Sequence, residues 1–171
     1  MDKMVKTPQI ILIDGPAGSG KTTLSLKLKS EVSSELSCEV IHLDTIYNGW
    51  DDALTETLTN NLRSLLDSFL AREPFNLAQY NWATKSFDSH RLIQPTDLLI
   101  IEGVGAGQAA IRTFATTLYW VEVDDEIGMK RVLERDGTEI FQEMTIWKLR
   151  EAEHFAKERT REFADFIIST A

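Results

Sequence analysis

The stretch Ile13-Asp-Gly-Pro-Ala-Gly-Ser-Gly-Lys-Thr-Thr23 decides the fold of this chain. Gly15, four further residues, Gly20, Lys21 and Thr22 reproduce the pattern G-x-x-x-x-G-K-[ST], which is typical of a loop that binds nucleotide phosphates. At average residue usage the pattern arises by chance in on the order of one chain in a few hundred of this length. The phosphate-binding interpretation therefore comes first, and the sequence around the loop has to support it.

The loop lies between a predicted strand and a predicted helix. Gln9 to Ile13 is a short apolar run rich in β-branched residues, which is typical of a strand buried on both faces of a parallel sheet. From Thr22 to about Leu36, apolar residues recur at helical spacing. A strand before the loop and a helix after it are the context that the motif requires.

The rest of the chain continues the alternation of strands and helices. Further strands are predicted at Glu39–Leu43, Thr96–Ile101 and Leu118–Val123, and helices at Asp51 to about Leu70, Asp125–Asp136 and Glu139 to about Glu162. Ala164–Ser169 fits either a fifth strand or the end of the last helix, and we favour the strand. We expect an α/β fold of three layers, with a five-stranded parallel sheet and helices on both faces, in a single domain that spans residues 1–171.

Composition narrows the classes of partner and location. The net charge is -9, from 27 acidic and 18 basic side chains, so the chain would repel nucleic acid and acidic lipid. We expect a small-molecule partner, no nucleic acid and no membrane, because the longest apolar runs are far shorter than the roughly 20 residues of a membrane helix. Cys38 has no second cysteine to pair with, and the N-terminus has no secretion signal, which predicts a cytoplasmic protein. The sequence gives no indication of oligomeric state.

The residues of the loop predict how a nucleotide would be held. Glycines let the backbone curl so that its N–H groups converge on the β- and γ-phosphates, beside the positive end of the following helix. Lys21 adds a mobile charge, Thr22 a hydroxyl ligand for Mg²⁺, and Ser19 a further hydrogen bond. The predicted nucleotide-binding residues are Gly15, Ala17, Gly18, Ser19, Gly20, Lys21, Thr22 and Thr23.

Two acids follow neighbouring strands. Glu102 ends the predicted strand Thr96–Ile101 and is placed to hold Mg²⁺ with Thr22, directly or through water. Asp44 follows the strand Glu39–Leu43 and is placed to face the γ-phosphate, as a further metal ligand or as the base that accepts the proton of an attacking hydroxyl. An isolated aspartate is more often a helix cap or a turn residue, but the phosphate loop nearby favours the catalytic interpretation.

The helix Asp125–Asp136 carries clustered basic residues. Arg131 and Arg135 lie one turn apart on one face, and a positioned arginine accelerates phosphoryl transfer by about 10³ to 10⁵. We predict that both are catalytic and that residues of about 125–145 form a lid. The alternative is that these arginines are solvated partners of Glu134 and Asp136.

Two segments, Tyr47–Asp52 and Tyr80–Trp82, combine aromatic rings with amides or carboxylates. Such a combination suits a ring that bears hydroxyl groups, as in a nucleoside, although Trp and Tyr are equally common as half-buried packing residues. We assign Trp120 and Trp147 to packing and no chemistry to the three histidines. The predicted acceptor-binding residues are Tyr47, Trp50, Asp51, Tyr80 and Trp82, with Asp52 as the alternative to Asp51.

Taken in order, these segments resemble the uridine kinase-like branch of the P-loop kinases over nearly the whole chain. GPAGSGKTT is similar to that family's phosphate loop, LDTIY to the segment that carries its base, AQYNWA to its substrate segment, LLIIEGVGAG to a strand end, and MKRVLERD to its lid. The resemblance implies the P-loop NTPase fold of nucleoside and nucleotide kinases, ATP as donor, Mg²⁺ as cofactor, and transfer of the γ-phosphoryl group to a hydroxyl of a small acceptor.

Departures from that family leave the acceptor open. Asn81 stands where the family has an aspartate, and the lid is short after Gly137. A kinase for a hydroxyl compound other than a nucleoside therefore remains an alternative. A regulatory ATPase or nucleotide-dependent switch is the alternative from another class, although the chain has no guanine-reading N-K-x-D sequence.

Overall fold

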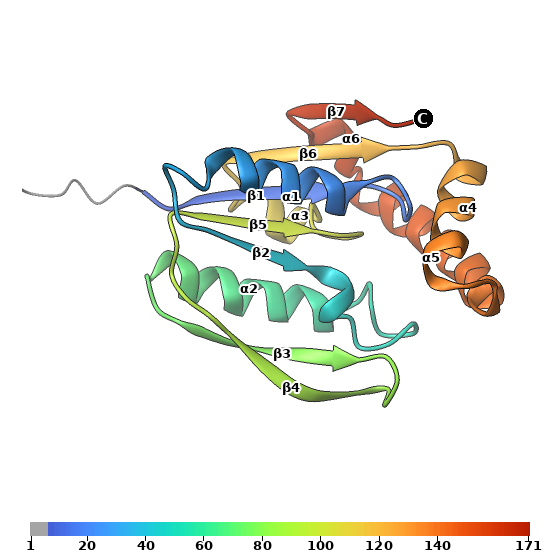
Figure 1. Cartoon of the computed structure of the whole chain (residues 1–171), viewed down its shortest axis with the longest axis horizontal. Helices are drawn as coiled ribbons and strands as arrows, with labels where there is room; N and C mark the ends of the chain where they lie inside the picture. Colours follow the sequence, from blue (N-terminus) through green and yellow to red (C-terminus); the bar gives the residue numbers. More distant parts are fainter. Residues whose placement is uncertain (1–6) are drawn as a thin grey trace, which may run out of the picture.

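A computed structural model describes residues 7–171 and contains the predicted five-stranded sheet (Figure 1). The strands lie in the order β2-β5-β1-β6-β7, and every neighbouring pair is parallel. Their bounds are β1 Gln9–Asp14, β2 Cys38–His42, β5 Leu98–Glu102, β6 Thr117–Glu122 and β7 Phe166–Ser169. The closing strand favoured from the sequence is confirmed, and β1 lies at the centre, with β5 and β6 on either side.

Helices cover both faces of the sheet because the side chains of each strand alternate between the faces. Ile13 of β1 and Ile100 of β5 pack with α1 (Lys21–Val32) in one apolar cluster. Leu12 and Ile101, one position away, pack in a second cluster with α2 (Glu56–Leu70), α3 (Ala109–Arg112) and α5 (Phe141–Glu158). The predicted arrangement of three layers is therefore confirmed.

The elements predicted from the sequence need several corrections, and helix α1, which was predicted to reach about Leu36, already ends at Val32. The hairpin of β3 (Phe75–Asn81) and β4 (Ser86–Ile93) was not predicted, because most of its side chains are at least partly exposed and it lies outside the main sheet. Helix α2 begins at Glu56, not at Asp51, because Thr55 caps it by accepting a hydrogen bond from the Thr57 N–H. The last predicted helix is divided at Arg159, whose φ of 53° ends α5 before the short α6 (Thr160–Phe163).

The remaining helices lie beyond the carboxyl ends of the strands. Helix α4 (Asp125–Asp136) follows β6, and the 3-10 turn η2 (Thr138–Ile140) joins it to α5 (Figure 1). A second 3-10 turn, η1 (Leu43–Thr45), follows β2 directly. No helix within residues 7–171 is long and apolar enough to cross a membrane.

A buried carboxylate joins the end of β1 to two loops. Asp14 is fully buried and accepts hydrogen bonds from the N–H groups of Gly15, Gly105 and Gly107, at 2.7, 3.0 and 2.8 Å. These contacts hold the start of the phosphate loop against the loop that follows β5. Burial raises the pKa of Asp14 from 3.8 to about 6, although the three N–H groups and Lys21 act to lower it.

We predict that the titration of Asp14 lowers the free energy of unfolding as the pH rises from about 4 to about 6. Over that interval the folded state keeps a proton that the unfolded state has released, because the pKa of Asp14 is about 6 in the folded protein and 3.8 ordinarily. The full effect is about 3 kcal/mol, at 1.36 kcal/mol per pKa unit. Urea unfolding of the wild type and of Asp14→Asn at several pH values measures it, and an equal decline in both proteins would contradict the assignment.

Candidate functional site

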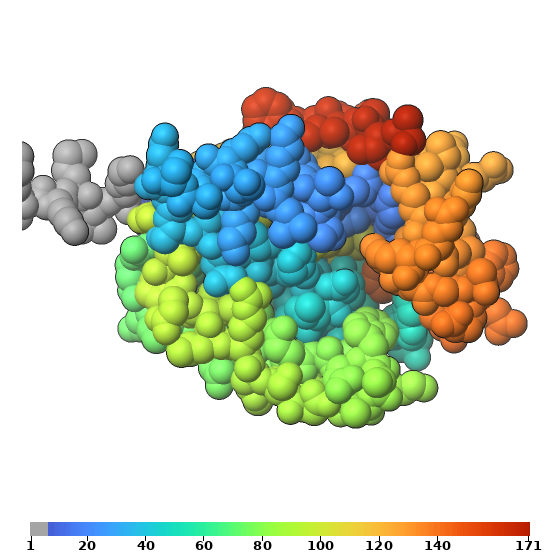
Figure 2. Space-filling view, viewed as in Figure 1, coloured from blue at the N-terminus to red at the C-terminus, as the bar shows by residue number. Residues whose placement is uncertain are grey.

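A cavity of about 490 Å³ opens at the carboxyl ends of β1, β2 and β5. In the space-filling view the surface is hollowed between the blue and cyan N-terminal half and the orange segment of α4 (Figure 2). Many of the predicted site residues line this one cavity: Ala17, Gly18, Lys21, Thr22, Asp44, Tyr47, Trp50, Trp82, Glu102 and Arg135.

The phosphate loop requires glycine because other backbone lies close to it. Gly15 has a φ of +143°, and a Cβ there would lie 1.9 Å from the Val121 carbonyl oxygen. Gly18 has a φ of +78°, and its Cβ would lie 2.2 Å from the carbonyl oxygen of Gly128 in α4. Both positions combine a left-handed backbone with no room for a side chain. The loop is therefore held between the sheet and α4.

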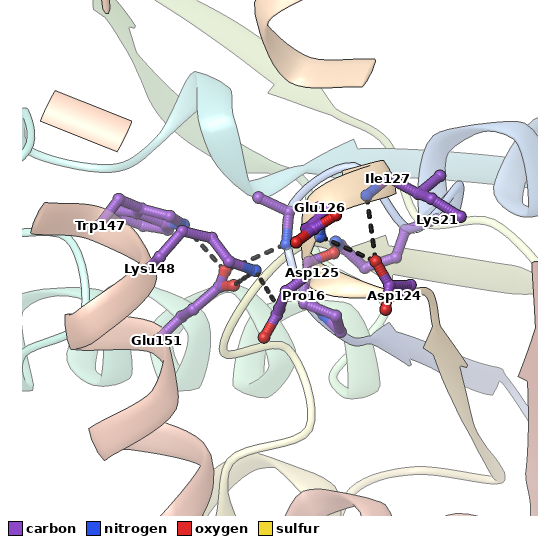
Figure 3. A network of polar contacts seen from close by, with 10 residues as sticks. Pro16, Lys21, Asp124, Asp125, Glu126, Ile127, Trp147, Lys148 and Glu151 are labelled. Carbon is purple, nitrogen blue, oxygen red and sulfur yellow. Dashed lines mark hydrogen bonds and ion pairs between the residues drawn. The ribbon is translucent and has the colours of Figure 1, made fainter. Parts of the chain in front are cut away.

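Lys21 and Thr22 begin α1 at the edge of the cavity. Lys21 is 8% exposed, and its ammonium group donates a hydrogen bond of 2.8 Å to the Pro16 carbonyl (Figure 3). Burial lowers the pKa of Lys21, while the carboxylates of Glu102, Asp14 and Glu151 act to raise it. The Thr22 hydroxyl donates a hydrogen bond of 2.9 Å to Glu102 Oε1, so the predicted metal-binding pair is in direct contact.

Glu102 also contacts a histidine to which the sequence assigned no chemistry. His42 Nδ1 lies 2.5 Å from Glu102 Oε1, the same oxygen that accepts the Thr22 hydrogen bond. This hydrogen bond is the main cause that raises the pKa of His42, since the carboxylate favours the imidazolium. Asp44 faces the cavity from η1, and burial and then the charge of Glu102 raise its pKa.

The residues present fit a nucleotide and Mg²⁺. The Ser19 hydroxyl is buried and has no hydrogen-bond partner among residues 7–171, so a donor in the loop is left for a ligand. Thr22, Glu102 and Asp44 present the oxygen ligands that Mg²⁺ prefers. The described part of the chain contains no group of three or more His, Cys, Asp or Glu side chains that could hold a metal.

Aromatic rings form the other end of the cavity. The Trp50 ring centroid lies 5.2 Å from that of Trp82 and 5.9 Å from that of Trp147, both edge to face. The Trp82 indole N–H donates to the Asp44 backbone carbonyl at 2.8 Å, which links the β3–β4 hairpin to the predicted base. Trp147 packs on Tyr47 as well, but it also lines the cavity, so its assignment to packing alone was incomplete.

Seven predicted site residues are not part of the cavity lining: Gly15, Ser19, Gly20, Thr23, Asp51, Tyr80 and Arg131. The Asp51 side chain is 91% exposed and pairs with Arg150 at 2.8 Å. Arg131 donates to the carbonyl oxygen of Gly18, at 3.2 Å, and to the Thr170 hydroxyl. Tyr80 packs on Trp82 and Phe87, and Thr23 is exposed. Arg135 does line the cavity, where its guanidinium pairs with Asp136.

Several residues that shape the site were not predicted from the sequence. Asp14 directly precedes the loop, and its place at the end of an apolar strand was a signal that it is buried. Trp147 and Glu151 lie four residues apart on α5, which places both on one helix face, but the sequence does not show that this face meets the phosphate loop. The apolar part of the lining is also new: Val104, Val132, Ile140 and Met144.

Comparison with known proteins identifies the family. The family model described as an AAA domain matches residues 11–155, most of the chain. The chain belongs to this family. Among curated relatives, a uridine kinase from Limosilactobacillus reuteri is 25% identical, with 95% of this chain and 84% of the relative covered. A uridine kinase from Lactobacillus helveticus is 28% identical, with 81% of this chain and 72% of the relative covered.

Solved structures place this AAA domain within the P-loop kinase fold. The structure of a possible uridine kinase from Bacillus stearothermophilus aligns with a TM-score of 0.68 at 22% identity, over 94% of this chain and 88% of that one. A shikimate kinase from Bacteroides thetaiotaomicron aligns with a TM-score of 0.56 at 16% identity, over 94% of this chain and 86% of that one. The P-loop NTPase fold implied by the sequence is therefore confirmed.

We predict that Glu102→Gln lowers the pKa of His42 toward its ordinary value. The carboxylate is the largest cause that raises this pKa, and an amide carries no charge to favour the imidazolium. Because the folded pKa is raised, His42 stabilises the wild type below its unfolded pKa of 6.5, and this stabilisation is lost as the pH rises through the folded value. NMR titration of the imidazole resonances measures the shift; an unchanged His42 pKa would show that Glu102 is not its cause.

Proposed function

We propose that this protein is an ATP-dependent kinase that transfers the γ-phosphoryl group to a hydroxyl of a small, nucleoside-like acceptor. One observation carries the proposal: a single cavity joins the phosphate loop to the Asp44 carboxylate and to a wall of aromatic rings. The aromatic rings lie beside Asp44, where a second molecule with a ring would fit, and a site that only hydrolyses ATP needs no pocket for an acceptor.

The phosphate end of the cavity would hold the donor. Bound ATP and Mg²⁺ supply the phosphoryl group and a concentrated positive charge. The loop N–H groups and the Ser19 hydroxyl would bind phosphate oxygens, and Lys21 would turn from the Pro16 carbonyl to the γ-phosphate. Thr22, with Glu102 or Asp44, would hold the metal directly or through water. Arg135, at the cavity edge, would neutralise charge that spreads over the transferring group.

The aromatic end would hold the acceptor. Trp50, Trp82 and Tyr47 line the cavity next to Asp44, so a stacked ring would present its hydroxyl groups to that carboxylate. Asp44 would orient one hydroxyl and accept its proton, and its raised pKa makes it a stronger base than an ordinary aspartate. Closure of the predicted lid, which spans residues from about 125 to 145, would exclude water from the site. The relatives named uridine kinases support a nucleoside as acceptor.

We predict that Lys21→Ala and Asp44→Asn each lower kinase turnover at least tenfold while the fold stays intact. Lys21 loses the charge that stabilises the transferring group, and Asp44→Asn loses the proton acceptor. Turnover is measured as acceptor phosphorylation at saturating ATP, with Asp67→Asn on the exposed face of α2 as a control of equal charge change. Full activity of Asp44→Asn would remove Asp44 as the base.

We predict that Trp82→Ala weakens acceptor binding by roughly tenfold, since ring stacking contributes about 1 to 3 kcal/mol. Trp82→Phe, which keeps a ring but loses the hydrogen bond to Asp44, should weaken it less. Thermal stabilisation in the presence of a non-hydrolysable ATP analogue, Mg²⁺ and candidate acceptors measures the effect. Stabilisation by the ATP analogue alone, to which no acceptor adds, would favour a regulatory ATPase over a kinase.

A further inference from the structure

Glu151 of α5 connects the two ends of the cavity through one oxygen atom. Its side chain is 2% exposed, and Oε2 accepts a hydrogen bond of 3.0 Å from the backbone N–H of Ala17 in the phosphate loop. The same oxygen accepts a bond of 3.1 Å from the indole N–H of Trp147, whose ring lines the aromatic end. Figure 3 shows this carboxylate between the Trp147 indole and the phosphate loop.

The other oxygen of Glu151 continues the connection to α4. Oε1 pairs with the Lys148 ammonium group, which also lies 2.9 Å from Asp125 Oδ1 in the first turn of α4 (Figure 3). The phosphate loop meets α4 directly as well, because Gly18 and Gly128 bring their backbones together. The loop, α4 and α5 are thus fixed to one another at several points.

We propose that Glu151 is a positioning residue for phosphoryl transfer. Its side chain holds the phosphate loop and the aromatic end of the cavity at a fixed distance from each other. The proposal rests on the proposed kinase function. It follows from the sharing of Oε2: the Ala17 amide and the Trp147 indole cannot move apart without losing a hydrogen bond in a buried place. Transfer requires the γ-phosphate and the acceptor hydroxyl to lie about 3 to 3.5 Å apart and in line, so this spacing governs the rate.

A positional role differs from a role in charge balance, and two conservative variants separate them. Glu151→Asp keeps the negative charge but is one methylene shorter, so its oxygen cannot reach both donors. Glu151→Gln keeps an oxygen at the Oε2 position for both donors but loses the charge. Since its amide N–H₂ would then face the Lys148 ammonium, it is combined with Lys148→Met. Glu153→Gln, on an exposed position of α5, is the control.

The first readout needs no ligand. Hydrogen exchange of the Ala17 amide and the Trp147 indole N–H is followed by NMR, with amides of strand β5, which is paired on both sides, as the internal reference. We expect Glu151→Asp to speed exchange at both sites at least tenfold relative to the reference, and Glu151→Gln/Lys148→Met to stay within about threefold of wild type. The positional role would be overturned if exchange were faster in Glu151→Gln/Lys148→Met than in Glu151→Asp, if it were equally fast in both variants, or if it changed in neither.

The second readout is steady-state kinetics, in which kcat and the KM for the acceptor are measured separately. Glu151→Asp should raise the KM for the acceptor and lower kcat, each at least fivefold, while Glu151→Gln/Lys148→Met keeps both within about threefold. A loss of thermal stability in Glu151→Asp with unchanged kcat and KM would show a merely structural role and overturn the proposal. Failure to phosphorylate any acceptor would overturn the kinase function instead, and the exchange experiment would still decide whether Glu151 fixes the spacing.

Discussion

The convergence of three strand ends is the constraint on which the site depends. Strand β1 lies between β5 and β6, and the chain leaves β1 to form β2 on one side and returns later to form β6 on the other. At such a switch point the connections diverge to opposite faces and leave a crevice at the carboxyl ends of the strands. The phosphate loop follows β1, Asp44 follows β2, and Glu102 ends β5, so the parallel order alone brings them together.

The chemistry of the cavity depends on charges that are held in a largely desolvated place. Lys21 is surrounded by Glu102, Asp14 and Glu151, which favour its charged form against the effect of burial. Each of these carboxylates accepts hydrogen bonds, from Thr22, from the loop glycines, or from Ala17 and Trp147. Buried charges persist in a fold when they are paired and hydrogen-bonded in this way. The acids therefore hold the phosphate loop in shape.

Much of this arrangement could be predicted from the sequence because it depends on local rules. The glycine spacing, the buried strand runs and the acids at strand ends fix the loop, the sheet and the approach of Thr22 to Glu102. The β3–β4 hairpin and the roles of Trp147 and Glu151 depend on contacts between segments far apart in the chain. A half-exposed hairpin gives only a weak periodic signal, and a helix face does not reveal its partner. Asp51 shows the same limit, since its pairing with Arg150 on α5 is not visible locally.

Transfer of labelled phosphate tests the central claim most directly. The wild-type protein is incubated with Mg²⁺, ATP labelled at the γ-phosphate, and single members of a panel of nucleosides, nucleotides, sugars and vitamins, and the labelled products are separated and identified. Our account predicts that label passes to a hydroxyl of one acceptor class, most readily a nucleoside, and that the Asp44→Asn protein transfers at least tenfold less. Label released only as inorganic phosphate, at one rate whichever acceptor is added, would contradict it.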